Sequence, residues 1–142
     1  MGRRKPMGGD PLSHLPHGPS FRFIDRILEY VPGERVVALK NVTFGEPYMP
    51  GHLPGSPSMP GAYLLEAMTQ TAGILLSAGS PAYLARVRDV RAGRAVVPGD
   101  RLTIEANLLQ GFGSLHRCEV KAMVDGNITC HAEIVLSVGS EQ

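Results

Sequence analysis

Two ionisable side chains stand where the sequence could support proton chemistry, and His52 is the first of them. It lies in the segment 45–61, which contains five prolines and four glycines. Such a composition predicts a stiff, ordered loop rather than a helix or a strand. An imidazole titrates near neutral pH and suits a general base. A loop histidine is more often a surface residue, however, so His52 alone is a weak signal.

Glu66 is the second, and it is the one charged residue in the apolar run 61–77. An unpaired carboxylate in an apolar interior is costly, so Glu66 needs a partner or a cavity that solvent reaches. The plainer alternative is that Glu66 lies on an exposed strip of a helix. Its neighbours at helical spacing, such as Ala62 and Ala67, are apolar and favour the first interpretation.

The start of the same run supplies a third chemical group. Pro60 suits the first turn of a helix, since proline lacks only an amide that would be unpaired there. The amides of Gly61 and Ala62 have no partner within a helix and could donate to a carbonyl oxygen that becomes negatively charged. A base, an acid and an oxyanion donor thus occur within fifteen residues.

The pattern of apolar residues predicts the elements that position these groups. Residues 61–77 are apolar around the whole circumference, which is typical of a buried helix. Residues 36–44 follow a Pro-Gly turn signal and are rich in β-branched residues, so they are expected to form a strand. Four strands are expected after the helix as a meander, at 83–90, 101–110, 115–124 and 128–138.

The last two of these strands show a regular alternation of apolar and polar residues. A three-residue loop, Asp125-Gly126-Asn127, would pair Val124 with Ile128 and bring their apolar faces together. A two-residue turn would set those faces on opposite sides. The sequence therefore predicts the three-residue loop.

That register also predicts where the two cysteines lie. Cys118 would face Ile134, and Cys130 would face Ala122. The cysteines then lie on the order of 13 Å apart, beyond the reach of a disulfide. We expect both in the core of a protein from a reducing compartment.

The bulk composition predicts one domain spanning residues 1–142, with 1–11 as a flexible tail. The chain is 43% hydrophobic and 19% charged, with a net charge of +1, so neither nucleic acid nor anionic lipid is an expected partner. The most apolar stretch is interrupted by polar residues, which argues against a membrane span and for a soluble, cytoplasmic protein. His14 and His17 form the only close histidine pair, and no further ligands cluster there, so no metal is expected.

Four groups of short stretches form one combined pattern. They are Gly51-His52-Leu53-Pro54-Gly55-Ser56-Pro57-Ser58-Met59-Pro60-Gly61, Leu65-Glu66-Ala67-Met68 with Gln70, Leu15-Pro16-His17 before Phe21 and Ile24-Asp25-Arg26, and Val96-Val97-Pro98-Gly99-Asp100 with Val124-Asp125-Gly126. Each short piece is weak, but the combined pattern is specific and covers nearly the whole chain. It resembles one enzyme family, the bacterial (3R)-hydroxyacyl-[acyl-carrier-protein] dehydratases.

The resemblance implies an α+β hotdog fold, in which an antiparallel β-sheet wraps a long central helix. It implies loss of water from a 3-hydroxyacyl thioester, carried by acyl carrier protein or coenzyme A, to give a trans-2-enoyl thioester. His52 would act on the C2 proton and the 3-hydroxyl, Glu66 would assist, and the Gly61 amide would hold the thioester carbonyl. Tyr63 and Gln70 are expected beside the substrate. The resemblance further implies no metal or nucleotide cofactor, and a homodimer with two active sites at its interface; a trimer of dimers stays open.

Arg86 stands where the family usually has glycine, in a strand beside the acyl tunnel, so it is expected to contact substrate and change the chain-length preference. Two other functions on the same fold also stay open. One is thioester hydrolysis, which centres on a carboxylate and does not need His52. The other is a non-catalytic module that binds acyl chains or their carrier.

Overall fold

The computed structural model describes residues 10–18, 21–52, 55–77 and 81–139. The elements in these ranges follow one another along the chain as η1 (Pro11–His14), β1 (Arg26–Val31), β2 (Arg35–Asn41), η3 (Met49–Gly51), α1 (Gly61–Ser77), β3 (Ala82–Ala92), β4 (Arg101–Phe112), β5 (Leu115–Val124) and β6 (Asn127–Val138). Here η denotes a short 3-10 helix.

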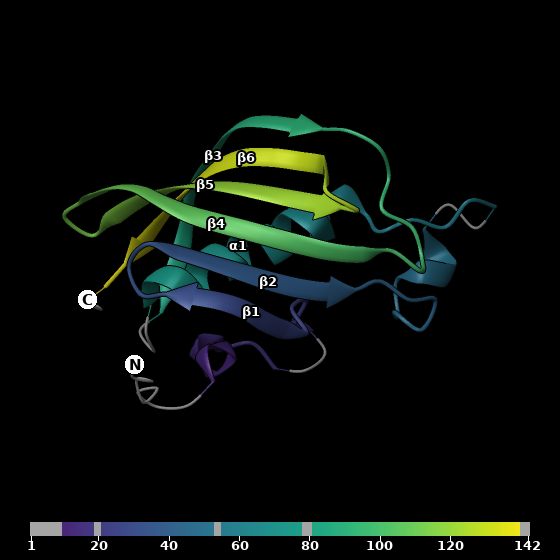
Figure 1. Cartoon of the computed structure of the whole chain (residues 1–142), viewed down its shortest axis with the longest axis horizontal. Helices are drawn as coiled ribbons and strands as arrows, with labels where there is room; N and C mark the ends of the chain where they lie inside the picture. Colours follow the sequence, from purple (N-terminus) through teal and green to yellow (C-terminus); the bar gives the residue numbers. More distant parts are fainter. Residues whose placement is uncertain (1–9, 19–20, 53–54, 78–80, 140–142) are drawn as a thin grey trace.

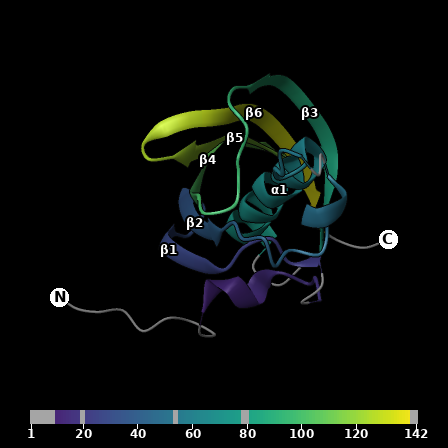
Figure 2. The same cartoon turned by 90° about the vertical axis from the view of Figure 1, so that its right-hand side faces the viewer.

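The strands form one antiparallel sheet in the order β1-β2-β4-β5-β6-β3 (Figure 1). In Figure 2 this sheet curves around α1, which runs through the middle of the molecule. The short helix η1 packs against both α1 and β1. The expected α+β fold, with a central helix wrapped by an antiparallel sheet, is therefore confirmed.

Helix α1 has the bounds that the sequence predicts, 61–77. Pro60 precedes it, and its carbonyl oxygen accepts hydrogen bonds from the amides of Tyr63 at 2.9 Å and Leu64 at 3.0 Å. The proline thus provides the first acceptor of the helix while its missing N–H costs nothing there. One side of α1 is buried, whereas the opposite strip, which includes Ala62, Glu66 and Gly73, is exposed or only partly buried, so the helix is less completely buried than the sequence predicts.

The core lies between α1 and the concave face of the sheet. Alternate residues of β4 and β5 point inward, as period-two strands require. Each large aliphatic side chain buried there stabilises the fold by about 1.5–3 kcal/mol relative to an exposed one. These inward residues are Leu102, Ile104, Ala106, Cys118, Val120, Ala122 and Val124.

Two features of the sheet differ from the expectation. Strand β1 was not predicted: it is short, its alternation is broken by a register shift between Ile27 and Glu29, and none of its residues is fully buried. The expected meander is also wrong for β3, which pairs with β6 at the edge of the sheet, whereas β4 lies beside β2. Local patterns carry no information on which strands become neighbours.

The turn of the last hairpin differs from the predicted three-residue loop. Asp125 and Gly126 have φ values of 53° and 79° and form a two-residue turn, so Val124 pairs with Asn127 rather than with Ile128. A register shift then leaves Thr129 without a cross-strand partner, and its hydroxyl donates to the Ala122 carbonyl at 3.1 Å. This bulge restores the apolar alignment that a two-residue turn would otherwise reverse.

The predicted positions of the cysteines are confirmed beyond that bulge. Cys118 pairs with Ile134, and Cys130 pairs with Ala122. Both thiols are buried and free. The alignment is right even though the predicted loop is wrong, because the bulge adds the residue that the shorter turn leaves out.

Most of the expected tail, residues 1–9, lies outside the described residues. Asp10 caps η1, since its carboxylate accepts the Leu12 amide at 3.0 Å. Among the helices that the structure describes, none is long and apolar enough to cross a membrane.

Candidate active site

The ring of His52 is held in one orientation by the loop that follows it. Its Nδ1 donates to the backbone carbonyl oxygen of Ser58 at 2.8 Å, and the Ser58 hydroxyl lies 3.4 Å from the same nitrogen. A carbonyl oxygen can only accept, so Nδ1 carries the proton in this geometry. The other ring nitrogen, Nε2, is then left with a free lone pair, which is the requirement for a general base.

The loop that carries His52 is anchored at both ends. On the early side, the buried Lys40 of β2 pairs with Glu46 at 2.9 Å, and the Glu46 carbonyl accepts the Met49 amide at 3.0 Å. On the late side, Met59 donates its amide to the Val96 carbonyl at 2.8 Å. Between these points η3 ends at Gly51, and His52 caps it by donating its backbone amide to the Met49 carbonyl. These contacts explain how a segment without regular secondary structure can hold a side chain rigidly.

Glu66 is partly buried on α1 and has polar partners, as the sequence requires. Its Oε2 accepts a hydrogen bond from Gln70 Nε2 at 3.0 Å, one helical turn later. Gln70 is itself buried, and its amide also donates to the Phe21 carbonyl at 2.9 Å and accepts the Phe23 amide at 3.0 Å. Glu66 is thereby fixed to the segment that leads into β1. Glu66 lies on the less buried strip of α1, with Ala62, Thr69 and Gly73, and 27% of its side chain is exposed while its carboxylate is hydrogen-bonded to Gln70.

Glu66 opens onto a pocket of about 210 Å³. The pocket lies between α1, the segment after η1 and the first residues of the edge strand β3. Its described lining residues are His14, Leu15, Pro16, His17, Glu66, Thr69, Gln70, Gly73, Ala82, Tyr83, Leu84 and Leu136. His52 is not among them, so the pocket of a single chain does not combine the two expected catalytic side chains.

The helix start offers the expected donors. The Tyr63 and Leu64 amides are occupied by Pro60, whereas no hydrogen bond from the Gly61 or Ala62 amide occurs within the described part of the chain. Gly61 is exposed, and a Cβ added there would meet nothing within 4 Å. A carbonyl oxygen can therefore approach these amides. A residue with a side chain at position 61 would not block it, so the expected need for glycine is not supported.

Tyr63 belongs to an aromatic cluster beside the loop rather than to the described lining of the Glu66 pocket. Its ring stacks on Phe23 at 5.2 Å and meets Tyr48 edge-on at 4.9 Å. The Tyr48 hydroxyl is buried and has no hydrogen-bond partner among the described atoms. Burial, reinforced by the nearby Glu46 carboxylate, raises the pKa of Tyr48 far above its ordinary value. This hydroxyl therefore stays protonated at physiological pH.

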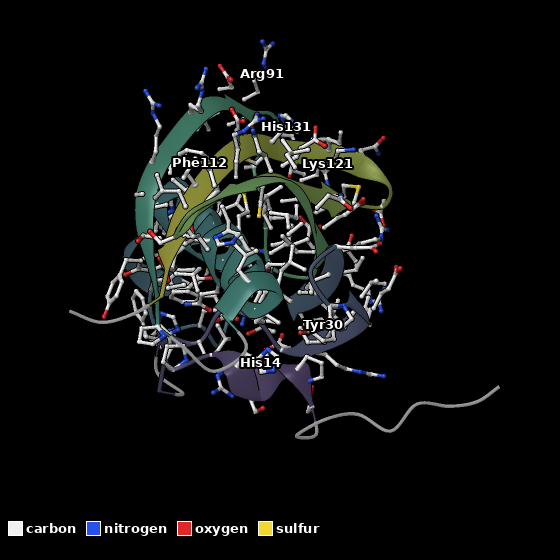
Figure 3. All side chains as sticks on the ribbon, turned by 90° about the vertical axis from the view of Figure 1, so that its left-hand side faces the viewer. His14, Tyr30, Arg91, Phe112, Lys121 and His131 are labelled. Carbon is white, nitrogen blue, oxygen red and sulfur yellow. The ribbon has the colours of Figure 1, made fainter. Side chains whose placement is uncertain are left out.

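Arg86 lies in a different place from Glu66. It lines a separate pocket of about 540 Å³ together with Phe112, Leu115, Arg117 and other residues of β3 to β6. Its partner in the sheet is Val135. The structure thus does not bring Arg86 to Glu66 within one chain, and contact between Arg86 and substrate stays a prediction. Figure 3 shows other charged side chains of this sheet, Arg91 and Lys121 among them, on its outer side.

His17 contacts the site, although the sequence analysis gave it no catalytic role and treated it as a candidate metal ligand and as part of the matching stretch Leu15-Pro16-His17. Its Nε2 lies 3.6 Å from Glu66 Oε2, and it lines the Glu66 pocket. The two residues are far apart in sequence, and nothing in their spacing signals the contact. No group of three or more metal-binding side chains occurs among the residues that the structure describes.

Comparison with known proteins identifies what the chain is similar to. A family model described as a FabA-like domain matches residues 15–133. A 3-hydroxyacyl-[acyl-carrier-protein] dehydratase FabZ of Polynucleobacter asymbioticus is 40% identical over 135 residues, which cover 92% of this chain and 91% of that protein. The protein of the same name from Desulforamulus reducens is 42% identical over 132 residues, covering 89% of this chain and 93% of the relative.

Solved structures agree on the fold. A chain of the dehydratase heterocomplex ApeI:P from Xenorhabdus doucetiae superposes with a TM-score of 0.79 at 19% identity, covering 93% of this chain and 92% of that one. A hypothetical thioesterase with coenzyme A from Streptococcus pneumoniae superposes with a TM-score of 0.66 at 17% identity, covering 82% and 87%. At these identities the likeness establishes the fold alone.

Proposed function

The chain belongs to the FabA-like family, and we propose that it is a 3-hydroxyacyl-[acyl-carrier-protein] dehydratase, a hydro-lyase that forms trans-2-enoyl thioesters in fatty-acid or related lipid or polyketide biosynthesis. The geometric observation that carries the proposal is the hydrogen bond from His52 Nδ1 to the Ser58 carbonyl at 2.8 Å. This hydrogen bond leaves Nε2 free to act as the base, and it fixes the orientation of the His52 ring relative to the backbone. Relatives about 40% identical over nearly their whole length supply the reaction class.

In the proposed reaction His52 removes the proton on C2 of the 3-hydroxyacyl thioester. Negative charge then develops on the thioester oxygen, and the amides of Gly61 and Ala62, which have no partner in the described part of the chain, are suited to donate hydrogen bonds to this oxyanion. The C3–O bond breaks as Glu66 delivers a proton to the leaving hydroxyl, so the products are a trans-2-enoyl thioester and water. The chain's own side chains suffice for each proton transfer, so the proposal names no cofactor.

The proposed site is shared between two copies of the chain. Glu66 lines a pocket whose described wall lacks His52 but includes Ala82, Tyr83 and Leu84, the first residues of β3. Strand β3 is an edge strand: within the described residues it pairs with β6 alone, and its other side has no strand beside it. A second copy paired along β3 would lie beside the Glu66 pocket and could supply its own His52.

The surface of β3 supports this assembly. Most of its eleven residues are exposed, including Tyr83 at 69%, Leu84 at 50% and Val90 at 49%. Exposed apolar side chains on a long edge strand favour association. We therefore propose a homodimer with two equivalent sites, built by pairing the same surface on both chains.

A cytoplasmic location is proposed on the state of the thiols. Cys118 and Cys130 are both free, and neither lies opposite the other in the sheet. Free cysteines are usual in reducing compartments.

One assay tests the function against the two alternatives. The purified protein is incubated with 3-hydroxybutyryl and 3-hydroxydecanoyl thioesters of acyl carrier protein and of coenzyme A, while enoyl absorbance and free thiol are followed in parallel. Enoyl product that is absent with His52→Ala supports the dehydratase. Free thiol without enoyl product would instead establish a thioesterase, and binding without turnover would establish a non-catalytic module.

A further inference from the structure

We propose that His17 is a positioning residue that acts through Glu66, holding its carboxylate and returning a proton to it after each turnover. The inference rests on the proposed dehydratase function and extends it to a residue that acts from outside the pair His52 and Glu66. It starts from one contact, the 3.6 Å between His17 Nε2 and Glu66 Oε2.

The surroundings of Glu66 leave His17 as its one titratable neighbour within ion-pair distance among the described residues. Gln70 also contacts the carboxylate, but an amide neither gives up nor accepts a proton at ordinary pH. The other titratable side chains that line the same pocket are His14 and Tyr83, and neither makes an ion pair or hydrogen bond with Glu66 in the described part. A proton that returns to Glu66 from a side chain of the same chain therefore comes from His17.

No hydrogen bond among the described residues selects the tautomer of the His17 ring, in contrast to the rings of His52 and His14. His52 donates Nδ1 to the Ser58 carbonyl, and His14 directs Nδ1 to the Ile74 carbonyl at 3.2 Å, so a backbone oxygen selects the tautomer of each. His17 Nδ1 is buried and has no hydrogen-bond partner among the described atoms. No acceptor fixes the proton of His17 on one nitrogen, so Nε2 can both take up and release it.

The position of His17 is nevertheless well defined. Its carbonyl oxygen accepts a hydrogen bond from Arg22 Nη2 at 3.3 Å, and its ring lies against Phe21 with the centroids 5.9 Å apart. About 30% of its side chain is exposed, so the ring reaches both solvent and the Glu66 carboxylate. The 3.6 Å gap exceeds a direct hydrogen bond, but catalytic hydrogen bonds often shorten when substrate binds.

The proton balance of the reaction gives His17 its role. Each dehydration leaves Glu66 as a carboxylate, because its proton departs with the hydroxyl as water, and leaves His52 with the C2 proton. The next turnover requires Glu66 to be protonated again. In the proposed step, imidazolium His17 transfers its Nε2 proton to Glu66 and is reprotonated by solvent, while His52 loses its proton to solvent. One proton enters and one leaves, so no further reactant is needed.

The first test compares His17→Gln with a matched control, His131→Gln. His131 on β6 pairs with Glu119 at 2.9 Å and is as exposed as His17, but it lies on the outer side of the sheet (Figure 3). We expect His17→Gln to lower kcat about tenfold or more with KM unchanged within twofold, because substrate contacts are kept while proton return is lost. We expect His131→Gln to match the wild type. Unchanged kcat in His17→Gln would overturn the proposal.

A second variant separates proton return from a purely structural role. His17→Ala leaves space for imidazole, so added imidazole should restore at least part of the lost kcat, whereas it should not affect His131→Ala. A loss of kcat that imidazole leaves untouched would mean that His17 only supports the fold and would also overturn the proposal.

A spectroscopic arm keeps the test independent of the proposed function. Ring ¹⁵N spectra of the wild type and of Glu66→Gln should differ at His17 Nε2 and coincide at His131. Should the wild type form no enoyl product, the dehydratase proposal fails and this arm still decides whether His17 and Glu66 are coupled. An unchanged His17 resonance would reject the coupling.

Discussion

Gln70 joins Glu66 to the chain that precedes β1, with Gln70 Nε2 placed 3.0 Å from Glu66 Oε2 across one turn of α1. The same amide also satisfies the Phe21 carbonyl and the Phe23 amide. One buried side chain therefore serves both the stability of the fold and the orientation of the expected acid.

Replacing Gln70 should consequently affect both properties. Gln70→Leu leaves the Phe23 amide and the Phe21 carbonyl without their partner, so we expect the free energy of unfolding to fall by on the order of 1–3 kcal/mol, together with a loss of kcat. Urea denaturation and steady-state kinetics measure the two effects. Thr71→Val is the control, since Thr71 donates only to the Ala67 carbonyl within α1, and it should keep full activity. Full activity in Gln70→Leu would show that Glu66 does not need this partner.

The roles of His52 and Glu66 are tested by single substitutions. We expect His52→Ala to reduce turnover by several orders of magnitude and to change the free energy of unfolding by no more than about 1 kcal/mol, because a loop side chain contributes little packing. Glu66→Gln is nearly isosteric but cannot deliver a proton, so it should retain less than about a tenth of the wild-type rate. Loss of folding in His52→Ala would instead indicate a structural histidine.

The shared site makes a quantitative prediction for mixtures. Inactive His52→Ala and Glu66→Gln chains are unfolded together and refolded, so that about half of the dimers are heterodimers. Each heterodimer contains one site with both lesions and one intact site, so the mixture should regain about a quarter of wild-type activity. Zero recovery, with heterodimers present by mass spectrometry, would place both residues in the same chain's site.

Acid stability should depend on Glu105 of β4. Burial tends to raise the pKa of this carboxyl, but hydrogen bonds from Asn107 and Arg35 outweigh it and hold the pKa below its usual value. A carboxyl with a lowered pKa contributes stability above its unfolded pKa and loses it as the pH falls through the folded value. Urea denaturation should therefore find the wild type more stable than Glu105→Gln at pH 7, with the difference shrinking below about pH 4.5. A difference that does not change with pH would contradict this.

The cysteines should be inert in the folded protein. Burial raises the pKa of Cys118 to about 12 and also raises that of Cys130, so almost no reactive thiolate exists at pH 8. A chromogenic disulfide reagent should titrate no thiol in the native protein and both of them in denaturant. Rapid native labelling would mean that the sheet opens around these strands.

The sequence alone determined the features that depend on neighbouring residues. The apolar circumference of residues 61–77, with Pro60 before them, predicted α1 to the residue. The alternation in β5 and β6 predicted that Cys118 faces Ile134 and Cys130 faces Ala122. In each case the local backbone preference and the tertiary packing favour the same answer.

The tertiary structure decided what depends on contacts between distant segments. The two-residue turn at Asp125-Gly126 is followed by a bulge at Thr129. The bulge forms because the apolar residues of β5 and β6 must lie on the same face of the sheet. The place of β3 at the edge, and hence an open strand beside Glu66, follows from pairing with β6 rather than from its own residues. His17 reaches Glu66 because the segment after η1 folds back against α1. No periodicity encodes these contacts, since each arises when separate elements bury their apolar faces against one another.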